Sequence, residues 1–107
     1  MLDNQSMKSD PADIRTELGL KRDIIVRTVE GHGGRDVRIF GSVTRGSADE
    51  GSDIDLLIRL DPGRSLLDLI AMKQDLEDLL GREVDVVTEA AISPYIRERV
   101  LAEALSL

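Results

Sequence analysis

The sequence predicts a small α/β domain in which helices flank a mixed β-sheet. Helical and strand patterns alternate along the chain, and 107 residues are enough for one domain but not for two. With 41% apolar residues, one Phe, one Tyr and no Trp, the core must be aliphatic. We therefore expect one domain over residues 10–107, preceded by a polar, flexible tail over residues 1–9.

The first elements are predicted to be helical. Asp10 and Pro11 are typical of an N-cap and a first helical position, and apolar residues then recur at helical spacing. Gly19 is the expected break between two helices. The glycine-rich run over residues 31–34 ends the second helix, because glycine adopts the left-handed C-terminal conformation at little cost.

Three segments are expected to be strands. They are residues 37–40, 54–60 and 83–88, which are rich in β-branched or apolar residues. The second is apolar on both faces, which is typical of a strand in the middle of a sheet. A turn at residues 61–63 follows it, where proline precedes glycine.

Two further helices complete the predicted order. A leucine stripe over residues 66–80 predicts a helix that packs in the core and ends at Gly81. The last helix is expected to begin at Ser93-Pro94 and to continue through Leu105.

The charge balance limits the partners of the protein. Fourteen basic residues against 21 acidic ones give a net charge of −7. Direct nucleic-acid binding is not expected, since it needs positive charge and aromatic stacking platforms. An anionic substrate such as a nucleoside triphosphate requires divalent cations between it and the protein. No apolar run is long enough for a membrane span or a signal peptide, so the expected location is the cytoplasm.

Two aspartates bracket the first residue of the expected central strand. Strand alternation places Asp53 and Asp55 on one face, with Cα atoms about 7 Å apart. Neighbouring anions repel unless a cation lies between them, and oxygen ligands suit Mg²⁺ or Mn²⁺ better than zinc. If the strand of Asp85 pairs with theirs, the three carboxylates can hold two metal ions.

A second motif directly follows the first strand. At Gly41 the backbone can approach a ligand closely, and a helical turn beginning at Ser42 would direct N–H groups at an anion. This pattern favours a phosphate site, although the lysine of a P-loop is absent. Arg45 fits either a phosphate contact or a structural ion pair with Asp49 or Glu50.

Two conspicuous side chains are expected to be structural. His32, the only histidine, lies in the glycine-rich bend, where a catalytic role is not expected. Tyr95 is expected to pack half-buried on the last helix, in preference to serving as a modified residue or a partner contact.

The motifs combine into a family pattern. Gly41-Ser42, ten intervening residues and Asp53-Ile54-Asp55, with Asp85 later on its own strand, resemble the signature of the polymerase-beta-like nucleotidyltransferases. The sequence is most similar to their minimal branch, the MNT proteins. The resemblance covers about residues 37–87 and includes Arg45-Gly46 and Ser52.

The resemblance implies transfer of a nucleotidyl group from ATP to a hydroxyl, with release of pyrophosphate. It implies that Gly41 and Ser42 bind the β and γ phosphates. It further implies that Asp53 and Asp55 bind two Mg²⁺ (or Mn²⁺) ions, and that Asp85 binds one of them and helps to deprotonate the hydroxyl. The shortest members of the family are often antitoxins that add AMP to a tyrosine of a HEPN ribonuclease toxin.

The short chain agrees with such a role, since 107 residues leave little room for an acceptor-binding domain. We therefore expect an adenylyltransferase antitoxin that assembles with a HEPN-type toxin. Two alternatives stay open. One is a non-catalytic antitoxin that occludes its partner through exposed apolar residues of the last helix, which are Ile96, Val100, Leu101 and Leu105. The other is a small-molecule nucleotidyltransferase, of the antibiotic-modifying kind, that works as a dimer.

Overall fold

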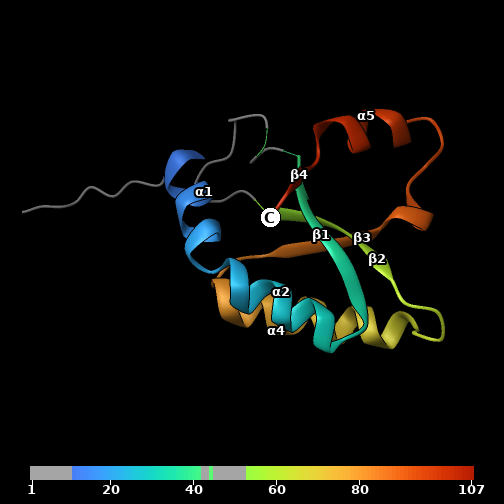
Figure 1. Cartoon of the computed structure of the whole chain (residues 1–107), viewed down its shortest axis with the longest axis horizontal. Helices are drawn as coiled ribbons and strands as arrows, with labels where there is room; N and C mark the ends of the chain where they lie inside the picture. The colour runs from blue at the N-terminus through green and yellow to red at the C-terminus, as the bar shows by residue number, and fades with distance from the viewer. Residues whose placement is uncertain (1–10, 42–43, 45–52) are drawn as a thin grey trace, which may run out of the picture.

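The computed structural model describes residues 11–41, 44 and 53–107. The expected tail and the predicted site residues Ser42 and Arg45 lie outside this range, as do Asp49 and Glu50. The elements are α1 (Pro11–Leu20), α2 (Arg22–Gly31), β1 (Gly34–Phe40), β2 (Ile54–Leu60), α4 (Leu66–Leu80), β3 (Val84–Thr88), η1 (Glu89–Ala91), α5 (Arg97–Glu103) and β4 (Leu105–Ser106). The predicted α/β class, a mixed sheet flanked by helices, is confirmed (Figure 1).

The four strands of the described residues form one sheet in the order β3-β2-β1-β4. β2 pairs antiparallel with β1 and parallel with β3, and β4 pairs antiparallel with β1. The parallel pair is connected through α4, as a crossover between parallel strands requires. β2 is thus a central strand, as its apolar sequence predicts.

The core lies between one face of this sheet and the helices α1, α2 and α4. Figure 1 shows α2 and α4 side by side beneath the sheet. Strand alternation directs Ile54, Leu56 and Ile58 to this face, and all three are at most 1% exposed. The other buried members of the cluster are Ile14, Leu18, Ile25, Val29, Val37, Ile39, Met72, Leu76, Leu80 and Val84.

A smaller apolar cluster lies on the opposite face. Leu57 is fully buried there, against Ile92 and Val100, which are each 8% exposed. Phe40, Val87, Leu101 and Ala104 pack around these three residues. α5 therefore covers the middle of this face.

The two N-terminal helices meet two residues later than predicted. Gly19 lies inside α1, and the chain bends at Lys21, the residue between the two helices. Lys21 still accepts a backbone hydrogen bond from Ile25, 2.9 Å long, so little hydrogen bonding is lost at the bend. The predicted division into two helices is confirmed, but its position is wrong.

β1 also begins earlier than predicted, at Gly34 instead of residue 37. Its first three residues are not apolar, so the hydrophobic pattern gives no strand signal there. The β1–β2 register shifts between Arg35 and Arg38, and Asp36 adopts φ 55° at this irregularity. Aspartate tolerates this conformation better than most residues do.

The ends of α4 follow the predicted rules, while its leucine stripe is only partly buried. Ser65 and Asp68 form a capping box at its start, and Gly81 ends it with φ 70°. Leu66 and Leu67 are 69% and 75% exposed, so the prediction that the whole stripe packs in the core is wrong for the first turn. The buried residues of the helix are Met72, Leu76 and Leu80, which lie further along it.

The C-terminus differs most from the prediction. The helix ends at Glu103, and Leu105–Ser106 pair with Arg38 and Ile39 of β1. The predicted helix through Leu105 is therefore wrong. The free edge of β1 offers backbone partners that a sequence pattern does not reveal, and the N–H of Leu107 donates to Val37 as well, at 3.1 Å.

The same region corrects the predicted docking face of the last helix. Val100 is buried and Leu101 is half-buried, so neither is free to contact a partner. Ile96 and Leu105 are exposed, at 41% and 50%, but they lie outside α5. Over the residues that the structure describes, no helix has the length and apolar character needed to cross a membrane.

Candidate active site at one edge of the sheet

The register of three strands brings four of the predicted site residues, Gly41, Asp53, Asp55 and Asp85, to one edge of the sheet. Asp55 pairs with Phe40 of β1 on one side and with Asp85 of β3 on the other. Gly41 follows Phe40 directly, and Asp53 precedes β2 by one residue. The predicted pairing between the strands of Asp53 and Asp85 is therefore confirmed. In-register neighbours on parallel strands share a face, and this one is opposite to the main core.

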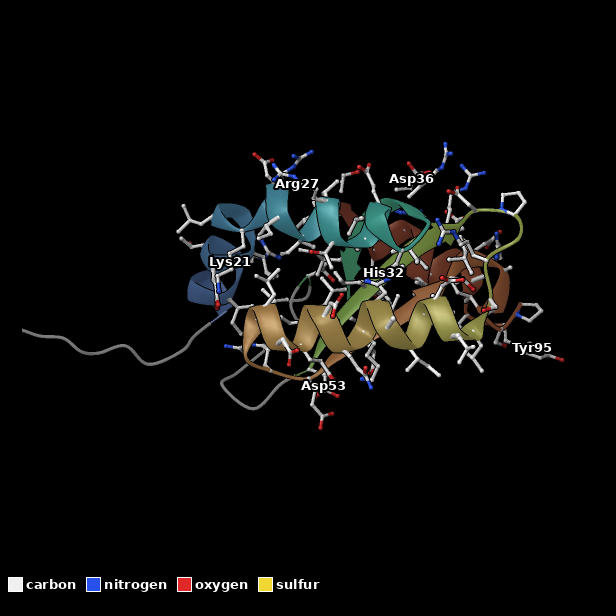
Figure 2. The ribbon with its side chains drawn as sticks, turned by 90° about the horizontal axis from the view of Figure 1, so that it is seen from below. Lys21, Arg27, His32, Asp36, Asp53 and Tyr95 are labelled. Carbon is white, nitrogen blue, oxygen red and sulfur yellow. The ribbon has the colours of Figure 1, made fainter. Side chains whose placement is uncertain are left out.

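The three carboxylates differ in exposure. Asp53 and Asp85 are exposed, while Asp55 is half-buried between its neighbours. Figure 2 shows Asp53 pointing away from the body of the protein. Within residues 11–41, 44 and 53–107, no three histidine, aspartate or glutamate side chains converge closely enough to hold a metal ion.

Gly41 lies directly against Asp55. Its φ of 81° is in the left-handed region, and a Cβ atom there would collide with a carboxylate oxygen of Asp55. Only glycine therefore allows the end of β1 to approach this carboxylate so closely. The hydroxyl of Thr44 donates to the Gly41 carbonyl at 2.8 Å, and Nη2 of Arg15 donates to the Thr44 carbonyl at 2.8 Å.

The donor chemistry of this edge fits a hard divalent cation. Asp53, Asp55 and Asp85 offer only carboxylate oxygens, the ligands that Mg²⁺ and Mn²⁺ prefer. The close approach of Gly41 to Asp55 places a glycine backbone directly beside one of these carboxylates. Their assignment as metal ligands, and that of Gly41 as a phosphate contact, stay predictions.

An ion pair of α4 reaches β3 just before Asp85. Nζ of Lys73 donates to Oε2 of Glu77 at 2.8 Å and to the carbonyl of Val84 at 2.7 Å. The same Oε2 accepts the N–H of Val84 at 3.1 Å. The sequence shows the lysine and glutamate at helical spacing, but nothing in it indicates that both contact β3.

These contacts shift two pKa values. The pKa of Lys73 is raised, mainly by its hydrogen bond with Glu77, and the charges of Glu77, Asp85 and Glu83 add to this effect. The pKa of Glu77 is lowered, first by the hydrogen bond from Lys73 and then by the N–H of Val84. Both groups are therefore held in their charged forms.

Neither His32 nor Tyr95 belongs to this edge. Nε2 of His32 lies 2.8 Å from Oδ2 of Asp75, so the histidine joins the end of α2 to α4. Tyr95 is 96% exposed, and the prediction that it packs half-buried is wrong. It precedes α5 at one end of the molecule, away from Asp53 (Figure 2).

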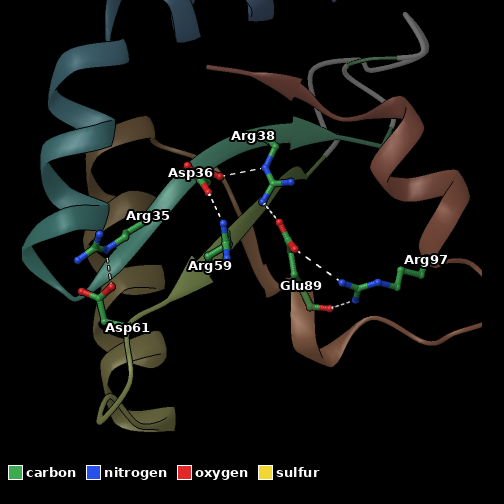
Figure 3. A network of polar contacts seen from close by, with 7 residues as sticks. All are labelled: Arg35, Asp36, Arg38, Arg59, Asp61, Glu89 and Arg97. Atoms are coloured by element: carbon green, nitrogen blue, oxygen red, sulfur yellow. Dashed lines mark hydrogen bonds and ion pairs between the residues drawn. The ribbon is translucent and has the colours of Figure 1, made fainter.

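A network of charged side chains lies on the same sheet face, further from the site (Figure 3). Glu89 of η1 pairs with Arg38 of β1 and with Arg97 of α5. Arg59 pairs with Asp36 at 3.2 Å. The network connects the sheet to the segment that carries α5, and each arginine in it has an acidic or carbonyl partner. We interpret it as structural.

The model of a family described as the nucleotidyltransferase domain matches residues 21–107 of the chain. The chain belongs to this family. The predicted resemblance is thereby confirmed, and so is the prediction of an enzyme that transfers a nucleotidyl group. A nucleoside triphosphate is the substrate that this family implies.

Two archaeal relatives carry more specific names. A candidate protein adenylyltransferase of Methanocaldococcus jannaschii is 44% identical over 82% of this chain and 94% of its own length. The protein adenylyltransferase MntA of Thermococcus cleftensis is 40% identical over 71% of this chain and 77% of its own length.

Solved structures match the nucleotidyltransferase fold. One, described as a minimal nucleotidyltransferase, is 42% identical, covers 97% of this chain and 100% of its own, and superposes with a TM-score of 0.77. Another is a toxin–antitoxin crystal structure with AMP-PNP, with a TM-score of 0.68 over 78% of this chain and 69% of its own. At 20% identity, this second likeness is one of fold alone.

Proposed function

We propose that this nucleotidyltransferase is a protein adenylyltransferase that transfers AMP from ATP to a hydroxyl of a toxin, a HEPN-type ribonuclease, and thereby neutralises it in the cytoplasm. Support for the reaction comes from the two relatives, which are named for protein adenylylation. Support for the partner comes from the toxin–antitoxin neighbour, whose fold this chain shares.

The observation that carries the proposal is the register of the sheet at Asp55. Asp85 is its partner on one side, and Gly41 contacts its carboxylate from the other. A glycine backbone beside carboxylates that suit a divalent cation supports a phosphate contact at this place. Nucleotidyl transfer needs this combination, because it depends mainly on positioning and on neutralising the triphosphate charge.

Each residue of the edge has a distinct role in the proposal. Asp53 and Asp55 would hold two Mg²⁺ ions, and Asp85 would hold the one nearer the attacking hydroxyl. Mg²⁺ held there would supply charge to neutralise the triphosphate and to make the hydroxyl more acidic. Gly41 and Ser42 orient the β and γ phosphates, and Arg45 contributes a further phosphate contact.

The bond changes balance without any further reactant. The acceptor oxygen forms a bond to the α-phosphorus of ATP while the bond from this phosphorus to the bridging oxygen breaks. The electron pair of that bond leaves with pyrophosphate. A carboxylate oxygen of Asp85 accepts the proton of the acceptor hydroxyl. The products are an adenylylated side chain and pyrophosphate.

The charge of the protein supports a partner of this kind. The chain carries a net charge of −7, whereas a ribonuclease must present positive charge to bind RNA phosphates. Opposite charges accelerate encounter and favour a basic partner over acidic proteins. The acidic chain is thus suited to a basic, RNA-binding acceptor.

The test uses ATP labelled at the α-phosphate, Mg²⁺ and the protein encoded next to this one. We expect label on the partner and loss of its ribonuclease activity. Changing Asp53→Asn together with Asp55→Asn should lower labelling by about a thousandfold. The matched control is Asp23→Asn with Asp78→Asn, which removes the same charge from exposed helical positions.

Four outcomes would overturn the proposal. An unlabelled partner excludes protein adenylylation, and label that survives the Asp53/Asp55 change excludes the carboxylate edge as the active site. If the double variant still neutralises the toxin, occlusion is the correct mechanism. Adenylylation of a small molecule in the absence of any partner would instead favour the antibiotic-modifying class.

A further inference from the structure

The segment before Asp85 is held from both sides, more firmly than an edge strand normally is. β3 is an edge strand of the sheet, so only one of its sides pairs with another strand. On that side the carbonyl of Glu83 accepts the N–H of Ile54 at 3.0 Å. On the open side, the N–H and carbonyl of Val84 both bind α4 side chains.

Those contacts fix two successive peptide planes. The plane between residues 83 and 84 is held by β2 through its carbonyl and by Oε2 of Glu77 through its N–H. The plane between residues 84 and 85 is held by Nζ of Lys73 through its carbonyl, at 2.7 Å. Because these planes lead directly into Asp85, they determine where its Cα atom lies.

Lys73 and Glu77 also hold each other. Their 2.8 Å contact closes a ring in which each side chain binds the other and one polar group of Val84. The side chains are partly exposed, at 40% and 29%, so the ion pair alone adds little to stability. The pair adds little stability, yet it binds the backbone next to Asp85, a predicted metal ligand. Its contacts are therefore better explained as positioning Asp85.

We propose that Lys73 and Glu77 are positioning residues for nucleotidyl transfer, which hold the Asp85 carboxylate beside Asp55. This inference rests on the proposed function, since it concerns the same edge of the sheet. The two residues act through the β3 backbone and do not touch the substrate. Their loss lets Asp85 move along the open edge, away from its partner on β2.

The chain offers a matched control at the junction of α1 and α2. Nζ of Lys21 binds Oε2 of Glu17 at 3.3 Å, four residues away, and also the carbonyl of Leu79 at 3.3 Å. It therefore makes the same kinds of contact, to a glutamate and to a backbone carbonyl of another element, but not to β3. Lys21→Gln measures what such a lysine contributes to stability alone.

The experiment compares Lys73→Gln, Lys73→Arg, Glu77→Gln and Lys21→Gln with the unchanged protein. Mn²⁺ binding is measured by electron paramagnetic resonance, and hydrogen exchange is measured at the Val84 amide. For adenylylation, kcat and the KM for ATP are determined separately.

For Lys73→Gln we expect weaker Mn²⁺ binding and a lower kcat, each by about tenfold, with a nearly unchanged KM for ATP. Exchange at the Val84 amide should become faster. Arginine at residue 73 keeps a cationic donor and should restore part of the loss, and Glu77→Gln keeps an acceptor and should have the milder effect. Lys21→Gln should lower the melting temperature without any of these changes.

The readouts separate this inference from the proposed function. If the unchanged protein adenylylates no partner, the proposed function fails, while weaker Mn²⁺ binding in Lys73→Gln alone still supports the positioning role. If Lys73→Gln and Lys21→Gln behave alike in Mn²⁺ binding and Val84 exchange, the pair is merely structural and the inference is wrong.

Discussion

The two faces of the sheet differ in what covers them and in what they contribute. One face is closed by α1, α2 and α4 over a continuous aliphatic cluster. The other has a small cluster around Leu57 in the middle, the aspartate edge at one end and the arginine network at the other. Consecutive residues of β2, such as Leu56 and Leu57, belong to different faces.

This difference shows how a small domain separates stability from chemistry. A carboxylate site needs water, cations and a substrate, so it cannot share a face with the main core. Strand alternation allows one strand to supply both, because every second side chain points the other way. The central strand β2 therefore belongs to both faces. Substitutions of its neighbouring residues can be used to compare the effect of each face on stability and activity.

The largest expected effect is a loss of stability when a leucine of the central strand β2 is shortened on either face. Leu56 and Leu57 are both fully buried, but Leu56 belongs to the larger cluster. We expect Leu56→Ala to cost about 3–5 kcal/mol and Leu57→Ala about 2–3 kcal/mol in the free energy of unfolding, since the smaller cluster can relax around a cavity. Urea denaturation at fixed pH measures both values.

Activity should follow the opposite order. Leu57 lies two residues from Asp55 on the same face, so Leu57→Ala should lower nucleotidyl transfer per folded molecule more than Leu56→Ala does. Equal losses of activity in the two variants would contradict the separation of the faces.

An intermediate effect is expected at Gly41, on the open face. Gly41→Ala places a methyl group against Asp55 and a non-glycine residue at φ 81°. We expect a loss of about 1–2 kcal/mol in stability from the strained backbone. Nucleotidyl transfer should fall by about a hundredfold, because the proposed mechanism requires the displaced carboxylate at the reacting centre.

The matched control for this substitution is Gly63→Ala. Gly63 has φ 88°, and nothing lies within 4 Å of an added Cβ. It should show a similar loss of stability with unchanged activity. If Gly63→Ala reduced activity as strongly, backbone strain alone would explain both results.

The smallest expected effect concerns pH and the Lys73–Glu77 pair. The lowered pKa of Glu77 means that its contribution to stability is present above its ordinary pKa of 4.5 and is lost as the pH falls through the folded value. Lys73 behaves in the opposite way, because its raised pKa keeps its contribution until the pH exceeds the ordinary value of 10.5.

Urea midpoints measured from pH 7 down to pH 3 test this expectation. The difference in stability between the unchanged protein and Glu77→Gln should shrink as the pH falls below 4.5. Asp68→Asn should show the same acid trend, since its N-cap hydrogen bond from Ser65 lowers the pKa of that carboxyl, but without any change in Mn²⁺ binding. A constant difference across this range would contradict the assignment for Glu77.

Much of the fold was predictable because its signals are local. β2 has the predicted bounds, and α4 begins at a capping box and ends at a glycine with positive φ, as the residue types require. Local signals fail where pairing with another strand determines the secondary structure. β4 forms only because β1 leaves an edge open, and the first residues of β1 form a strand without an apolar pattern.

The sequence by itself determined the types of residue at the site: aspartates separated by one residue at the start of a strand, and a glycine at the end of another. That information is local, since it depends on period-two alternation and on backbone sterics. Only the tertiary structure decided that Asp85 pairs with Asp55, that Gly41 lies against the same carboxylate, and that Lys73 and Glu77 hold the strand beside them. These relations depend on strand register and on helix packing, which join residues far apart in the chain and therefore leave no periodic signal in the sequence.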